Sequence, residues 1–136
     1  MDQALTKQMH DLVPFTAELA LSMIEASRDR VVGRAEWAAE RCTAGGVLHG
    51  GYLMATVDSV GAMCAVQNLP EGAAGTTTIE SKTNFLAGGR AGIMRATATP
   101  LHKGRRTMVW QTNITDETGR LLSVTTQTQL VIPPTT

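Results

Sequence analysis

The sequence predicts an α+β fold in which one antiparallel sheet curls around a single long helix. Two observations lead to this prediction. The stretch from Gly50 to about Gln67 is apolar or small on nearly every side, as expected of a helix that is buried all round. The second half of the chain then holds four segments rich in Thr and Val, separated by turns that contain glycine, which is typical of consecutive long strands. A sheet of such strands buries its apolar face by packing against the helix.

Four shorter elements precede the helix. Residues 2 to about 12 mix polar and apolar side chains and predict a short, loosely attached helix, so that residues 1–14 form an N-terminal extension. The remaining three are a second short helix and two strands, expected at residues 15–21, 21–26 and 31–37. A polar turn from Ser27 to Arg30 joins the two strands.

The long helix begins after the loop Ala44-Gly45-Gly46 and is stopped by Pro70 and Gly72. The strands that follow are expected at residues 75–86, 91–101, 105–116 and 120–132. A strand of about 10 residues spans roughly 33 Å. In the last strand, period-two alternation places five residues on one side: Val124, Thr126, Thr128, Leu130 and Ile132.

The bulk composition favours one globular domain over residues 1–136 and excludes several classes of protein. Lys and Arg number 12 against 12 Asp and Glu, whereas a nucleic-acid-binding protein normally has a basic excess. No apolar run approaches the roughly 20 residues of a membrane span, and the first 14 residues lack the apolar core of a signal peptide. We therefore expect a cytoplasmic protein with no nucleic-acid or membrane partner. Aromatic residues make up only 4%, and a core so poor in large side chains favours assembly with further copies.

The cysteines and histidines do not form a metal-binding or disulfide pattern. Cys42 and Cys64 lack CxxC spacing, and no histidine cluster accompanies them, so neither a metal site nor a disulfide framework is expected. Cys64 lies on the apolar helix and is expected in the core. His10 and His102 have no partner pattern and are expected at the surface.

Asp58 is the only formally charged residue between Thr43 and Leu69, in the middle of the helix that is expected to be buried. Burying an unpaired carboxylate is costly, and such carboxylates are frequent at functional sites. Asp58 is therefore a candidate catalytic residue. The alternative is a structural Asp that pairs with an arginine or accepts hydrogen bonds from backbone amides, and the residues alone favour neither reading.

The helix starts at the tetrapeptide Leu48-His49-Gly50-Gly51. The first amides of a helix have no partner within the helix and carry partial positive charge, and glycines allow a ligand to approach them closely. An amide here could stabilise the oxyanion that forms when a carbonyl is attacked. The alternative is an ordinary glycine-rich loop that enters a helix.

The spacing of these two features has a geometric consequence. Gly50 and Asp58 are eight residues apart, or about 12 Å along a helix, which is too far for both to act on one carbonyl. If both act, they come from different chains. A two-fold dimer that sets one helix tip against the Asp of the other helix would build two identical sites. We therefore expect a homodimer at minimum, with a homotetramer as the expected assembly.

Two stretches carry a resemblance to a known family. The runs GGVLHGGYLMATVDSVGAMCAV and TTTIESKTNFLAGGRAG resemble the hotdog-fold acyl-CoA thioesterases of the phenylacetate-degradation type. The shared pattern is HGG, an acidic residue nine positions after the His, and a Thr-rich strand that ends in Asn-Phe-Leu. The similarity covers about residues 15–132. It implies a hotdog fold, hydrolysis of acyl-CoA to free acid and CoA, and no cofactor beyond the CoA of the substrate.

By the same resemblance, Asp58 is the nucleophile or the general base, and the Gly50 amide polarises the thioester carbonyl. Thr78, on the strand after the helix, is the best match for the hydroxyl that helps to place the water. Many members carry Asn or Gln six residues before the motif His, where this chain has Thr43. A hydroxyl makes one such hydrogen bond but lacks the two-sided geometry of an amide. His49 is expected to orient the loop and cap the helix rather than to act as acid or base.

A basic cluster is expected near the CoA portion of the substrate. Lys103, Arg105 and Arg106 flank Gly104 at a strand turn, and Arg90 follows Gly88-Gly89. With Gly51 at the helix tip, these residues are candidates for binding acyl-CoA, and the cations of Lys103, Arg105 and Arg106 are expected to meet its phosphates. The alternative is a solvated hairpin.

Two other functions are compatible with the sequence. One is a different enzyme on the same fold, either a dehydratase, which would need His49 near the β-carbon of the acyl chain, or a thioesterase for carrier-protein substrates. The other is a non-catalytic acyl-CoA-binding module, which would usually carry a further partner domain.

Overall fold

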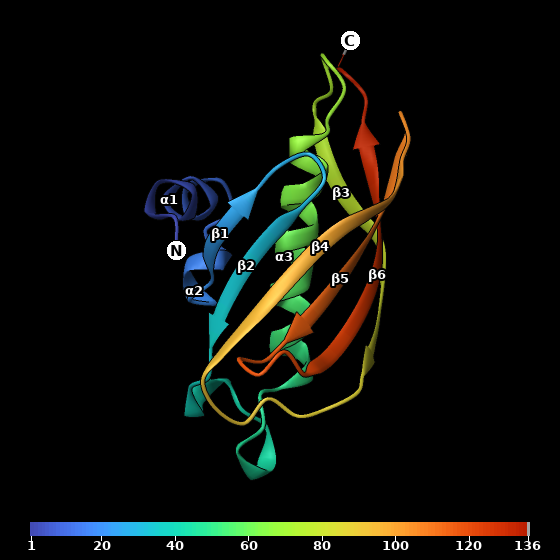
Figure 1. The fold of residues 1–136 in the computed structure, drawn as a ribbon. Coiled ribbons are helices and arrows are strands. Elements are labelled where there is room, and N and C mark those ends of the chain that lie inside the picture. Colours follow the sequence, from blue (N-terminus) through green and yellow to red (C-terminus); the bar gives the residue numbers. More distant parts are fainter. Residues whose placement is uncertain (136) are drawn as a thin grey trace.

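The computed structural model describes residues 1–135 and contains one six-stranded antiparallel sheet that curves around a long helix, α3 (Gly50–Gln67) (Figure 1). The strands are β1 (Ser22–Ala26), β2 (Val31–Glu36), β3 (Gly75–Phe85), β4 (Ile93–Lys103), β5 (Thr107–Thr115) and β6 (Leu121–Ile132). Their order across the sheet is β1-β2-β4-β5-β6-β3. The predicted α+β architecture, with a central helix wrapped by a curved sheet, is confirmed.

Strand β3 forms one edge of the sheet, although β4, the next strand in the sequence, lies in its middle. The connection at residues 86–92 passes the N-terminal end of α3 (Figure 1). It is fixed there because Leu48 N–H donates to the Gly89 carbonyl at 2.9 Å, while Leu86 N–H donates to the Leu122 carbonyl at 2.8 Å. This connection therefore holds the end of β3 beside the helix tip.

The core between α3 and the sheet contains methionines where many proteins have aromatic residues. Five of the seven methionines are buried, and Trp110 is the one fully buried aromatic side chain in residues 1–135. The buried methionines are Met9, Met23, Met63, Met94 and Met108. Unbranched thioether side chains fill irregular gaps between a helix and a curved sheet.

The N-terminal helix α1 (Gln3–Leu12) is anchored to the edge strand β1, so the loose attachment expected for it is wrong. Met9 is fully buried, the Met23 N–H donates to Thr6 Oγ1 at 2.9 Å, and His10 Nε2 lies 2.7 Å from the Leu21 carbonyl. Helix α1 thus covers the edge strand β1 and supplies hydrogen-bond partners that the backbone of this edge would otherwise lack.

Three short elements complete the fold before the long helix. Helix α2 (Phe15–Glu18) is shorter than expected because Ala20 adopts a positive φ of 51° and turns the chain into β1. Two 3₁₀ turns, η1 (Ala39–Arg41) and η2 (Ala44–Gly46), lead to α3. Among the helices of residues 1–135, none combines the length and the apolar character that crossing a bilayer requires.

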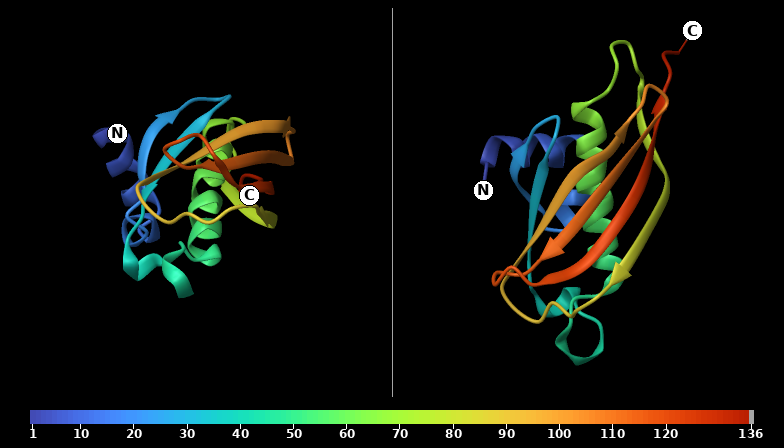
Figure 2. Two further views of the ribbon diagram at one scale, coloured as in Figure 1. Left: turned by 60° about the horizontal axis from the view of Figure 1, so that its bottom comes forward. Right: turned by 45° about the vertical axis from the view of Figure 1, so that its right-hand side comes forward.

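The sheet covers only part of α3, so the expectation that this helix is buried on all sides is wrong for a single chain. Figure 2 shows the sheet curving around one side of the helix. Most of the side chains left exposed or partly exposed recur every three or four positions, and these are Met54, Ala55, Asp58, Ser59, Ala62 and Val66. We call this surface the open stripe of α3. Apart from Asp58 and Ser59 it is apolar, and such a surface favours contact with another protein surface.

The two cysteines are both free thiols and differ in burial. Burial raises the pKa of the Cys64 thiol to about 12, whereas Cys42 is partly exposed. At pH 8 the folded protein is expected to react with one equivalent of DTNB per chain, at Cys42, and with two in denaturant, because the thiolate is the reactive form. Fast reaction of two thiols in the folded protein would contradict the packing of α3.

Candidate active site

Asp58 lies on the open stripe of α3, and one of its two carboxylate oxygens is held by neighbouring strands. Asp58 Oδ1 accepts hydrogen bonds from Thr78 Oγ1 of β3 at 2.7 Å and from Gln127 Nε2 of β6 at 2.8 Å. Asp58 Oδ2 has no hydrogen-bond partner within residues 1–135. Asp58 also forms no ion pair in that part of the chain. The carboxylate is therefore anchored through one oxygen and open at the other.

The expectation that Asp58 is buried is wrong for the single chain, where the residue is exposed. The reason is the open stripe, because the six strands end before they cover this side of the helix. A carboxylate that faces solvent has no desolvation penalty, so Asp58 becomes a costly buried carboxylate only if a further surface covers it.

Thr78 reaches Asp58 from the edge strand next to a β-bulge. The register between β3 and β6 shifts between Thr78 and Glu80, and bulges of this kind redirect side chains. The Thr78 hydroxyl gives its one hydrogen to Asp58 and accepts from Gln129 Nε2 at 2.6 Å. That hydrogen is thus directed at the carboxylate rather than at solvent.

The sequence reasoning missed Gln127 and Gln129, which are both fully buried. The alternation expected in β6 is present, but its inner side carries Thr125, Gln127, Gln129 and Val131, while the residues singled out from the sequence point away from the helix. Two glutamines two positions apart on the inner side of a strand are the signal that could have found them, because buried amides need hydrogen-bond partners.

The tip of α3 is capped by His49. Its Nδ1 accepts from the Gly51 N–H at 2.8 Å, and its carbonyl accepts from the Leu53 N–H at 3.1 Å. Because Nδ1 is the acceptor, neutral His49 carries its hydrogen on Nε2. The amides of Gly50 and Tyr52 have no hydrogen-bond partner within residues 1–135. The tip therefore offers free donors at the positive end of the helix.

Gly50 also lies under an aromatic ring. A Cβ at this position would lie 3.1 Å from Cζ of Phe85, which is itself 50% exposed at the end of β3. A cavity of about 350 Å³ adjoins the tip, with Val47, Leu53 and Gly89 among its walls. The glycine thus keeps the backbone amide close to an open space.

Thr43 and Arg90 lie in the loops around this same end of the helix. Thr43 is exposed, and its N–H donates to the Val47 carbonyl at 2.8 Å, next to the pairing of the His49 N–H with the Arg41 carbonyl. Arg90 Nη1 donates to the Gly45 carbonyl at 3.3 Å. Both residues are therefore near the helix tip of their own chain.

A second cavity, of about 400 Å³, lies beside His49. Tyr52 and Arg41 form one wall, with the guanidinium 5.7 Å from the centre of the Tyr52 ring. The Tyr52 hydroxyl donates to the Leu19 carbonyl at 2.7 Å, and burial raises the pKa of Tyr52. This tyrosine therefore connects the helix tip to the segment that follows α2.

The other basic candidates, Lys103, Arg105 and Arg106, lie at the opposite end of α3, at the turn between β4 and β5 (Figure 1). Lys103 Nζ is 2.6 Å from Asp29 Oδ1, and this ammonium lowers the pKa of Asp29. Gly104 is required at the turn because a Cβ there would lie 2.7 Å from the Thr107 carbonyl oxygen. An 18-residue helix is about 27 Å long, so within one chain this turn is far from Gly50.

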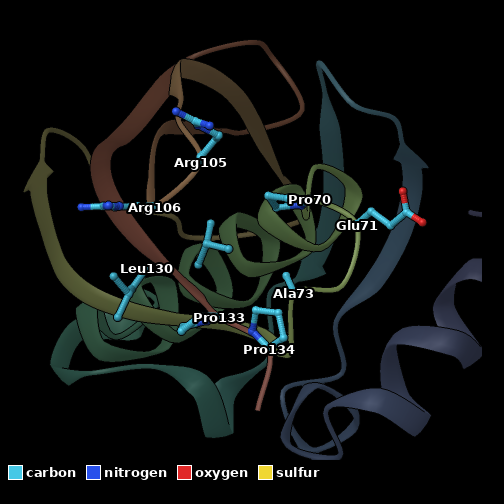
Figure 3. Close-up of a pocket in the computed structure, with 9 residues that line it drawn as sticks. Pro70, Glu71, Ala73, Arg105, Arg106, Leu130, Pro133 and Pro134 are labelled. Carbon is cyan, nitrogen blue, oxygen red and sulfur yellow. The ribbon is translucent and has the colours of Figure 1, made fainter. Parts of the chain in front are cut away.

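Arg105 and Arg106 are exposed at the rim of a cavity of about 380 Å³. Its other walls are mostly apolar and come from the segment after α3 and the C-terminal segment, and they include Pro70, Leu130 and Pro134 (Figure 3). In Figure 3 the carboxylate of Glu71 points away from both arginines. Within residues 1–135 neither arginine forms an ion pair.

The candidate site residues therefore form two separate half-sites in each chain. Asp58 and Thr78 meet at the middle of the helix, while His49, Gly50 and Gly51 form its tip, with Thr43 and Arg90 nearby. Residues 1–135 contain no group of three or more His, Cys, Asp or Glu placed to hold a metal ion.

Comparison with known proteins identifies the family. The thioesterase superfamily matches residues 45–123, which include both half-sites. The protein of Mycobacterium tuberculosis named "Putative esterase Rv1847" is 32% identical over 113 residues, which are 82% of this chain and 81% of that protein. The 1,4-dihydroxy-2-naphthoyl-CoA hydrolase of Escherichia coli is 37% identical over 76 residues, 56% of this chain and 55% of that enzyme.

Solved structures agree with this assignment. Thioesterase HI1161 of Haemophilus influenzae superposes with a TM-score of 0.86 at 26% identity, covering 94% of this chain and 90% of that one. The E. coli PaaI protein of the phenylacetic acid degradation operon has the same fold, with a TM-score of 0.84 at 21% identity over 97% of this chain and 94% of that one. The chain therefore belongs to the thioesterase superfamily, with the hotdog fold, and is a thioester hydrolase.

Proposed function

We propose that this protein hydrolyses acyl-CoA thioesters to the free acid and CoA, with Asp58 as nucleophile or general base and the Gly50 amide as the oxyanion contact. The observation that carries the proposal is the asymmetry of the Asp58 carboxylate, whose Oδ1 is held by two donors while Oδ2 is open. The hydrolase names of the E. coli and Listeria monocytogenes relatives, which specify 1,4-dihydroxy-2-naphthoyl-CoA, support a CoA thioester as substrate.

The reaction has two routes that use the same residues. In one, Asp58 takes a proton from water as the water attacks the thioester carbonyl. In the other, Oδ2 attacks the carbonyl, the C–S bond breaks to release the CoA thiolate, and water then hydrolyses the mixed anhydride to restore Asp58. In both, negative charge develops on the carbonyl oxygen, where a free amide at a helix N-terminus is stabilising.

The complete site in this proposal is shared between two chains. The open stripe of α3 and the exposed side chains Ile79 and Phe85 of β3 support a two-fold contact, because an apolar helix face and a strand edge lie side by side there. Such a contact would cover Asp58 and bring the Gly50 tip of the partner toward it. A homodimer is thus the minimum active assembly, and pairing of two dimers would give a homotetramer.

Turnover is tested by a panel of short, medium, long and aromatic acyl-CoA thioesters, with release of free CoA thiol as the readout. We expect hydrolysis of at least one class, and carrier-protein thioesters serve as the comparison. Absence of thiol release from every CoA thioester, with a folded protein, would contradict the proposal. Faster thiol release from the carrier-protein thioesters would indicate that these, and not CoA thioesters, are the preferred substrates.

The role proposed for Arg105 and Arg106 is to bind the phosphates of CoA. The double variant Arg105→Gln/Arg106→Gln is expected to raise KM for acyl-CoA about 10-fold, because charge-assisted hydrogen bonds to phosphate are lost. KM for a thioester of the same acid without the nucleotide should stay within about twofold. Lys7→Gln on α1 removes an exposed cation elsewhere and is the control. Equal effects on both substrates would indicate general destabilisation instead.

A further inference from the structure

Gln127 is a fully buried polar side chain whose hydrogen-bond donors all point to Asp58 or to Thr78, the residue that donates to Asp58. Its Nε2 lies 2.8 Å from Asp58 Oδ1, 3.3 Å from the Asp58 carbonyl oxygen and 3.2 Å from Thr78 Oγ1. The side chain thus contacts both the carboxylate and the main chain of the same residue. This pair of contacts restricts the rotation of the Asp58 side chain about its first two bonds.

The orientation of the Gln127 amide follows from its surroundings. Carboxylate and carbonyl oxygens surround the Nε2 side, so that the reverse orientation would set oxygen against oxygen. The other amide atom, Oε1, is buried and has no hydrogen-bond partner within residues 1–135. Burying a polar atom without a partner costs free energy. A hydrocarbon side chain of the same length would avoid this cost, and packing alone therefore does not account for a glutamine here.

Gly61 creates the space for this arrangement. A Cβ at Gly61 would lie only 1.8 Å from Gln127 Oε1, so no other residue at this position leaves the glutamine where it is. Glycine inside a helix costs roughly 1 kcal/mol relative to alanine. The helix thus has a weakening residue at the one position that lets Gln127 reach Asp58, one turn away.

Gln129 supports the same carboxylate through Thr78. Thr76 Oγ1 donates to Gln129 Oε1 at 2.9 Å, Gln129 Nε2 donates to Thr78 Oγ1 at 2.6 Å, and Thr78 donates to Asp58. The hydrogens of Gln129 and Thr78 point toward Asp58 Oδ1, while the Thr76 hydroxyl also lies 3.0 Å from the Leu130 carbonyl oxygen. Bonds arranged in series polarise one another. Two routes from the sheet, through Gln127 and through Thr78, therefore end on the same oxygen.

We propose that Gln127 is a positioning residue for the hydrolysis reaction, that Gly61 is its steric requirement, and that together they fix Oδ1 as the anchored oxygen and Oδ2 as the reacting oxygen of Asp58. This inference rests on the proposed role of Asp58. Gln127 does not touch the substrate and acts only through the carboxylate.

The first test is Gln127→Met, which keeps the length of the side chain and removes its donors. We expect kcat to fall about 10- to 100-fold, as for loss of a hydrogen bond to a charged group, with KM within about twofold and no loss of thermal stability. Thr112→Val is the matched control, because Thr112 is equally buried and its hydroxyl also lacks a partner within residues 1–135, yet it does not contact Asp58. Its kcat should stay within about twofold.

The second test is a double-mutant cycle with Gly61→Ala. Alone, this variant is expected to lower kcat as much as Gln127→Met does, because the new methyl group displaces Gln127. In a Gln127→Ala background the same substitution should lower kcat no further, since there is nothing left to displace. Additive losses of kcat in the two backgrounds would overturn the steric part of the proposal.

The outcomes distinguish this inference from the proposed function. Full kcat in Gln127→Met, together with an inactive Asp58→Asn variant, would overturn the role of Gln127 and leave Asp58 as the working carboxylate. Full activity in Asp58→Asn would overturn both. A fall in kcat for Thr112→Val as large as that for Gln127→Met would also reject a specific role, because any buried polar group would then have the same effect.

Discussion

Asp58→Asn is expected to lower kcat by at least about 10³-fold while leaving the fold intact, because the amide is neither a base nor a nucleophile at neutral pH. The side-chain oxygen of Asn can accept from Thr78 and Gln127 as Oδ1 of Asp58 does, and its NH₂ group then takes the open position of Oδ2. The structure around residue 58 is thus preserved, and only the reacting atom changes.

The measurement is steady-state thiol release from acyl-CoA, with thermal unfolding and gel filtration on the same samples. Asp11→Asn, on the exposed side of α1, is the control for removing one carboxylate. We expect the Asp58 variant to unfold within a few degrees of the parent and to keep its assembly state. Retained turnover would remove Asp58 from the mechanism.

Gly50→Pro is expected to lower kcat about 10²- to 10³-fold, which is typical for loss of one oxyanion-hole donor. Proline deletes the amide hydrogen at the first position of α3, where helices tolerate it. His49 precedes it with φ of −62° and ψ of 134°, an extended conformation that is compatible with a following proline. Gly50→Ala adds the same contact with Phe85 but keeps the N–H, so it should retain most of the activity.

A mixing experiment with these variants tests the shared site. Each variant alone is expected to keep no more than about 1% of the parent kcat. A mixed dimer of Asp58→Asn and Gly50→Pro chains, by contrast, has one site with both defects and one with neither. Random exchange of equal amounts makes half of the dimers mixed, so activity should recover to about a quarter of the parent value. No recovery after verified exchange would place Asp58 and Gly50 of one chain in the same site, or exclude one of them.

The overall architecture was accessible from the sequence because its signals are local. A continuous small and apolar stretch that ends before Pro70 predicted α3, and glycine-bearing turns separated the four strands that follow it. The contact between Asp58 and Thr78 was also within reach, since the family resemblance named both residues and the structure joins them at 2.7 Å.

The features that were predicted wrongly or missed depend on contacts between segments that are far apart in the sequence. Helix α1 was expected to be loose because its sequence is mixed, yet the edge strand β1 needs the contact that Thr6 provides. Asp58 was expected to be buried because hydrophobicity around a helix does not reveal which side the sheet leaves uncovered. Gln127 lies far from Asp58 in the sequence, and only the register of β6 against β3 and the gap at Gly61 bring the two together.

Because the core is rich in methionine, the oxidation of these side chains reports how often the interior of the protein opens. In the single chain Met1 is exposed and Met54 partly exposed, whereas the five buried methionines meet peroxide only when the interior opens. A sulfoxide formed at that moment is polar and costly to bury again in the apolar interior, so each opening event leaves a chemical mark that lasts until a reductase removes it. Under oxidant, the lifetime of this protein is therefore set by how often its interior opens.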